Sequence, residues 1–126
     1  MKKALSLFLL IFLSSCLFDN HFIPIDDDFE VGYVNMPKNR NIYYRSQGIL
    51  NNETVVAIGW EADIIFIKSQ PENKSTVNYY LIYKSAYKLN PEQMKSNGLQ
   101  GPLDSASFCN ELRKNGLSPV NYKHNW

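Results

Sequence analysis

One cysteine and two histidines are the side chains of this chain best suited to nucleophilic catalysis. A thiolate at Cys109 with His21 or His124 as its general base would suit acyl transfer. Cys109, however, falls on an apolar stripe, and both histidines fall in segments that we expect to be mobile. Because catalytic groups need rigid placement, we expect Cys109 to be structural rather than a reactive thiol. The sequence predicts no catalytic residues and no enzyme activity.

Carboxylates are the second group that could do chemistry. The run Asp26-Asp27-Asp28 could suggest calcium, but calcium loops take oxygens from alternating positions around a glycine turn, or from several loops. Glu61 and Asp63 lie two apart on a predicted strand, where such residues are usually solvated. The sequence has no paired metal-ligand spacing and no glycine-rich phosphate loop. We therefore predict no metal and no cofactor.

Cys16 carries the strongest chemical signal. Two lysines and an apolar run over residues 4–13 precede it, and this run is too short for a hydrocarbon core of ~30 Å. That pattern is typical of a secretory signal peptide. Its end, Leu13-Ser14-Ser15-Cys16, resembles the bacterial lipobox, which implies a diacylglyceryl thioether on Cys16 and cleavage before it. The alternative is an ordinary signal peptide with a coincidental cysteine.

The predicted organisation follows from this site. Residues 1–15 are the signal peptide, 16–28 a solvated lipidated tether, and 29–126 a single domain. The lipid on Cys16 would hold the protein on a membrane of the bacterial cell envelope. Leu17 is not the aspartate that signals inner-membrane retention in some bacteria, so we expect the outer membrane.

Composition narrows the partners. Removing residues 1–15 from the 126-residue chain leaves 111 residues, enough for one domain with one core. Lys2 and Lys3 leave with the signal peptide, so 11 basic side chains face 12 acidic ones, and this balance argues against nucleic acid. With Cys16 lipidated, Cys109 has no disulfide partner within the chain.

Hydrophobic periodicity predicts strands followed by a helix. We expect strands over residues 29–34, 42–45, 54–60, 62–68 and 77–84, with Ile64–Ile67 central and covered on both faces. Asn90-Pro91-Glu92 indicates a helix start. A second helix over 105–115, with Asp104 as its cap and Gly116 at its end, presents Phe108, Cys109 and Leu112 on one side. The predicted fold is α+β, a small antiparallel sheet of about five strands with the C-terminal helix packed on one face.

Tyrosines in the predicted strands are the candidate binding residues. Adjacent strand residues point to opposite faces, so one member of each tyrosine pair would face outward if only one face of the sheet were covered. We expect the outward members to gather opposite the C-terminal helix, as anchors for a protein partner. The alternative is that aromatic residues simply favour strands. The candidates are Tyr43, Tyr44, Tyr79 and Tyr80.

Three segments carry a family resemblance. They are residues 60–68 (WEADIIFIK), 79–84 (YYLIYK) and 101–104 (GPLD), followed by Phe108, Leu112-Arg113 and Gly116-Leu117. In this order they resemble a family of small uncharacterised bacterial lipoproteins that carry a domain of unknown function. The resemblance covers roughly residues 55–117 and implies no activity and no catalytic residues.

These observations favour a lipid-anchored envelope protein that acts as a non-catalytic interaction or structural module. The alternative is an immunity-type or inhibitor lipoprotein that blocks a toxin or an envelope hydrolase. Both roles need a membrane tether and a binding surface. They differ in affinity, because an inhibitor should bind one enzyme tightly.

Overall fold

The computed structural model describes residues 20–89, 98–118 and 121–126. The predicted lipidation site Cys16 and the predicted helix start at Asn90-Pro91-Glu92 lie outside these residues. Within the described part, no helix is long and apolar enough to cross a membrane.

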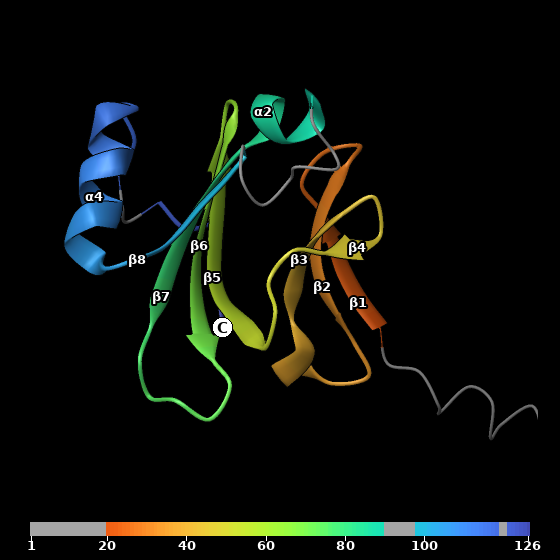
Figure 1. Ribbon diagram of the computed structural model, residues 1–126. Coiled ribbons are helices and arrows are strands. Elements are labelled where there is room, and N and C mark those ends of the chain that lie inside the picture. Colours follow the sequence, from red (N-terminus) through yellow and green to blue (C-terminus); the bar gives the residue numbers. More distant parts are fainter. Residues whose placement is uncertain (1–19, 90–97, 119–120) are drawn as a thin grey trace, which may run out of the picture.

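Two antiparallel sheets make up most of the molecule (Figure 1). The first runs in chain order through β1 (Asn20–Pro24), β2 (Phe29–Val34), β3 (Asn41–Tyr44) and β4 (Gln47–Gly48), with the short helix η1 (Pro37–Asn39) between β2 and β3. The second has the order β8-β7-β6-β5-β9. Its strands are β5 (Glu53–Glu61), β6 (Ile64–Pro71), β7 (Asn78–Tyr83), β8 (Leu99–Leu103) and β9 (His124–Asn125). The described helices are α2 (Lys84–Leu89) and α4 (Ser105–Lys114).

The central position of β6 explains its unbroken apolar run. Ile65 and Ile67 point into an inner core between the two sheets, whereas Ile64 and Phe66 point into an outer core beneath α4. All four side chains are buried, so the prediction of a central strand covered on both faces is confirmed. The inner core unites Phe29, Val31, Ile42, Tyr44, Ile49, Leu50, Val55, Ile58, Ile65, Ile67, Tyr80, Ile82 and Tyr87.

Helix α4 forms as its sequence predicts. The Asp104 carboxylate accepts a hydrogen bond from the Ser107 amide at 2.7 Å, and this bond holds the pKa of Asp104 below its ordinary value. Gly116 follows the helix with a φ of 71°, a left-handed conformation that glycine adopts readily. Phe108 and Leu112 are buried against the second sheet. An antiparallel five-stranded sheet with the C-terminal helix on one face is therefore confirmed.

The other face of that sheet differs from the expectation of a single sheet. The predicted strands over 29–34 and 42–45 form a separate sheet that covers this face. The short hairpins between β1, β2 and β3 bring these strands together before β5 begins. Helix α2, over residues 84–89 after the predicted strand, is a further element that the sequence did not predict.

Residues 20–24 were predicted to be part of the tether but belong to the folded part of the chain. They pair with β2 as strand β1. The acidic run after β1 is a hydrogen-bonded turn. Asp26 Oδ1 accepts hydrogen bonds from the amides of Asp28 and Phe29 at 2.9 and 2.8 Å. This turn reverses the chain into β2, which is why the run is not simply solvated.

Candidate interaction surface

The four candidate tyrosines do not share one face. Tyr44 and Tyr80 are buried in the inner core. Tyr43 is half-buried on the outer face of the first sheet, where its ring meets that of Phe22. Tyr79 is half-buried on the opposite side of the molecule, with its ring centroid 4.7 Å from that of Phe108. The prediction that they gather opposite the C-terminal helix is wrong, because the first sheet covers that face.

A polar cluster around Glu53 closes one end of the inner core. Its Oε1 accepts hydrogen bonds from Ser69 Oγ at 3.0 Å and from Asn78 Nδ2 at 2.7 Å, and its Oε2 accepts one from the Tyr80 hydroxyl. Burial, reinforced by the bond to Glu53, raises the pKa of Tyr80, so this hydroxyl remains a donor. The carboxylate is thus occupied by three donors, and we assign it a structural role.

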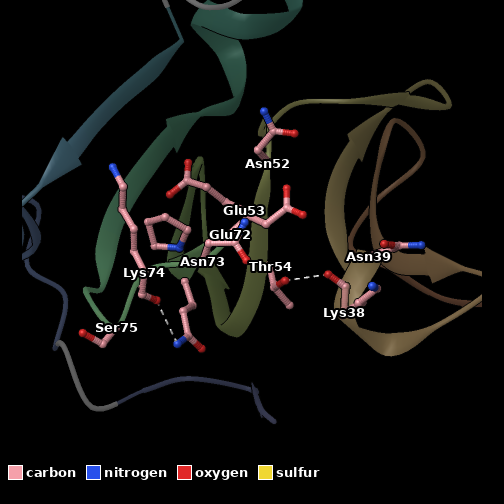
Figure 2. Close-up of a pocket in the computed structure, with 11 residues that line it drawn as sticks. Lys38, Asn39, Asn52, Glu53, Thr54, Glu72, Asn73, Lys74 and Ser75 are labelled. Carbon is pink, nitrogen blue, oxygen red and sulfur yellow. Dashed lines mark hydrogen bonds between the residues drawn. The ribbon is translucent and has the colours of Figure 1, made fainter.

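An open pocket of about 660 Å³, which Glu53 also lines, lies between η1 and the loop that joins β6 to β7 (Figure 2). Two hydrogen bonds tie its walls: the Thr54 hydroxyl donates to the Lys38 carbonyl at 2.5 Å, and Gln70 Nε2 donates to the Lys74 carbonyl at 3.3 Å. The lining is almost entirely polar and holds neither cysteine nor histidine. Its geometry indicates an open polar recess, without a paired nucleophile and base.

The most distinctive side-chain arrangement lies along β9. The ring of His124 stacks on that of Trp60, with centroids 5.9 Å apart and planes 26° apart. Its other neighbour is Trp126, at 5.6 Å and 15°. A cation closes each end, since Lys123 Nζ lies 4.4 Å from the Trp60 ring and Arg40 Cζ lies 4.0 Å from the Trp126 ring. We call these five side chains the edge stack.

Backbone pairing holds the edge stack in register. In β9, His124 pairs with Ile58 and Asn125 with Ala57 of β5. The Lys123 amide donates to the Ile58 carbonyl at 2.9 Å, and the Trp126 amide donates to the Val56 carbonyl at 2.8 Å. The register of β9 therefore fixes the position of the His124 and Trp126 rings along β5.

Arg40 reaches the edge stack from the first sheet. Its carbonyl accepts a hydrogen bond from the Val55 amide at 3.0 Å, and its guanidinium donates to the Val55 carbonyl at 3.4 Å. The guanidinium also lies 5.6 Å from the Tyr33 ring. Burial lowers the pKa of Arg40, yet a guanidinium stays charged in proteins. A charged side chain therefore lies between the Tyr33 and Trp126 rings and connects the two sheets.

Part of the edge stack is open to solvent. Trp126 is 45% exposed, Lys123 is exposed, and Trp60 and His124 are half-buried. Trp and Arg are the residue types enriched where binding energy concentrates in protein interfaces. The ring faces lie against one another and Arg40 is buried, so the stack offers ring edges and the Lys123 ammonium group to a partner.

The two histidines differ from their expected settings. His124 lies in β9, and His21 lies in β1 with its ring centroid 5.2 Å from that of Tyr33, so both belong to the folded part. Cys109 is half-buried on α4, where it packs against the outer core. The alternation of Tyr122, His124 and Trp126 with polar residues was the signal that could have predicted β9.

The described residues contain no group of three or more His, Cys, Asp or Glu side chains arranged to hold a metal ion. The chain matches no protein-family model, no curated protein and no solved structure.

Proposed function

We propose that the protein is a lipid-anchored lipoprotein of the bacterial cell envelope whose sandwich domain binds a protein partner without catalysis. The lipobox ending at Cys16 supports the anchor, and the edge stack supports the binding. The observation that carries the proposal is a solvent-exposed tryptophan, Trp126, held between His124 and Arg40.

Order in the edge stack favours binding. A side chain that is already fixed by its neighbours loses little conformational freedom when a partner covers it. The rings of Trp60 and Trp126 are fixed by His124 between them. Lys123, the exposed cation of the edge stack, would suit a carboxylate or a carbonyl group beside an apolar contact on the partner.

The test is a crosslinked pull-down of the acylated protein from its native envelope, made with the wild type and with Trp126→Ala. Because truncation of a central hot-spot residue costs at least about 2 kcal/mol, capture of the partner should fall roughly 30-fold. Arg113→Ala is the matched control, since Arg113 is also a large exposed side chain but lies on α4, outside the edge stack. Equal capture by the wild type and Trp126→Ala would refute the proposed surface.

The identity of the captured protein separates the two roles considered for the domain. A single toxin or envelope hydrolase, held tightly and losing activity in the complex, would make the protein an inhibitor. Partners that keep their activity would make it an interaction module.

A further inference from the structure

We propose that the end of the sandwich at which β1 begins rests on the lipid bilayer, through an apolar end patch formed by Phe22, Val34 and Met36. This inference rests on the lipid anchor proposed at Cys16 and adds an orientation to it. The domain would then be held against the bilayer in one direction rather than swing freely above it.

Chain length places this end close to the membrane. Three residues separate Cys16 from Asn20, the first residue of β1. Even a fully extended chain spans at most about 3.6 Å per residue, so Asn20 lies within roughly 14 Å of the lipidated cysteine. The surface around the start of β1 therefore faces the headgroups of the bilayer.

Exposed apolar side chains concentrate at that same end. Asn20 pairs with Val34, the last residue of β2, and the Met36 amide donates to the Val34 carbonyl at 3.0 Å. Phe22 is 38% exposed, Val34 37% and Met36 42%. Large apolar side chains that remain exposed together mark a contact surface.

Val77 extends this pattern to the second sheet. It is 38% exposed and lies in the loop between β6 and β7. That loop and η1 line the same pocket, so it lies at the end of the sandwich where β1 begins (Figure 1). The remaining large exposed apolar side chain of the described residues, Trp126, belongs to the edge stack.

The local packing keeps Phe22 on the surface of the first sheet. Its ring lies over Gly32, where a Cβ atom would come within 2.7 Å of Phe22 Cδ1 and 2.0 Å of the His21 carbonyl oxygen. The ring also meets that of Tyr43 edge-on, with centroids 5.4 Å apart. Phe22 is thus supported from below and beside, and its outer surface stays open.

Charge along the first sheet favours the same orientation. The far end of β1, about 13 Å from Asn20 at 3.3 Å per strand residue, leads into the turn Asp26-Asp27-Asp28. Arg45 pairs with Asp28 and Lys84 with Asp26, so Asp27 is the exposed carboxylate of this turn. The end with the patch instead carries exposed Lys38 in η1 and exposed Lys74 and Glu72 in the β6–β7 loop, so the lysines outnumber the carboxylate there. An anionic leaflet repels carboxylates and attracts lysine side chains. The acidic turn would therefore point away from the bilayer.

The experiment measures the depth of two fluorescent probes on the lipidated full chain. Nitrobenzoxadiazole is attached at Met36→Cys in the patch or at Asp27→Cys in the acidic turn, each in a Cys109→Ala background so that one thiol reacts. The vesicles contain phosphatidylethanolamine, phosphatidylglycerol and a lipid with a doxyl quencher near its headgroup. Melting curves establish that both labelled proteins are folded.

We expect the probe at position 36 to shift to the blue and to be quenched by doxyl lipid, because it would lie within about 5–10 Å of the headgroup–acyl boundary. The probe at position 27 should behave as it does in water. Equal, water-like emission from both probes on vesicle-bound protein would overturn the orientation while leaving the anchor intact. A probe at 36 that shifts to the blue without doxyl quenching would show that protein covers the patch instead. Protein that fails to float with the vesicles would refute the anchor and, with it, this inference.

Discussion

The guanidinium carbon of Arg40 lies 4.0 Å from the ring centroid of Trp126. Arg40 directly precedes β3 in the first sheet, and Trp126 directly follows β9 in the second. The contact thus joins residues from both sheets at the side of the sandwich, where Arg40 retains only 8% of its exposure. The candidate binding surface and the packing of one sheet against the other thus both involve Arg40 and Trp126.

Replacing Arg40 with lysine should lower the free energy of unfolding by about 1–2 kcal/mol, because an ammonium cannot stack its plane on Trp126 and Tyr33. Urea denaturation measures the loss. Arg113→Lys is the matched control, since Arg113 is exposed on α4 and should tolerate the change. Equal stability of the two variants would mean that the guanidinium contributes nothing to the union of the sheets.

The second sheet could be predicted in part because its signals are local. The apolar run Ile64–Ile67 needs cover on both faces, and Asp104 and Gly116 mark the two ends of α4. Each of these features depends on residues close together in the chain. Their prediction therefore does not depend on how distant segments of the domain pack.

The division into two sheets and the edge stack could not be predicted in this way. The pattern of residues 29–34 fits a strand whether the domain has one sheet or two. Only tertiary packing determines which sheet this strand joins. Arg40 and Trp126 are 86 positions apart in the sequence. Tyr43 and Tyr44 show the same limit, because strand alternation separates them but does not say which face another layer covers.

Tyr44→Ala should destabilise the domain far more than Tyr43→Ala. The Tyr44 ring packs with centroids 4.9 Å from Phe29 and 5.0 Å from Tyr87, and so connects the first sheet to α2. Removing a large buried ring costs about 3–5 kcal/mol. Tyr43 is half-buried on the outer face, so its truncation leaves no enclosed cavity. Thermal and urea melts of both variants test this; similar losses would place the two rings in equivalent environments.

Stability should fall in alkali, partly through Tyr87. Burial raises the pKa of Tyr87 to about 12, while an unfolded tyrosine ionises near pH 10. The folded state therefore holds this proton more tightly. Its contribution to stability is complete below about pH 10 and is lost as the pH rises toward 12. Tyr87→Phe keeps the ring but removes the ionisable group, so its stability should fall less steeply over this range in urea titrations. Parallel profiles for the two proteins would contradict the assigned cause.

Gly59→Ala should loosen the C-terminal segment and weaken partner capture together. A Cβ atom at position 59 would lie 2.3 Å from the Phe66 ring and 2.7 Å from the carbonyl oxygen of Asn121, three residues before His124. Phe66 is buried, so relief requires movement of the ring or of the chain that leads into β9. Overpacking of this kind costs about 1–3 kcal/mol. Urea denaturation would measure that cost, and the envelope pull-down would measure capture through the displaced Trp126.

The matched control for Gly59→Ala is Gly116→Asn. Gly116 has a φ of 71° and open space where its Cβ would lie, and asparagine tolerates this conformation at the end of a helix. Gly116→Asn should therefore keep both stability and capture. If Gly59→Ala lost stability but captured the partner at the wild-type level, the edge stack would not need its register on β5, and the binding surface would have to lie elsewhere.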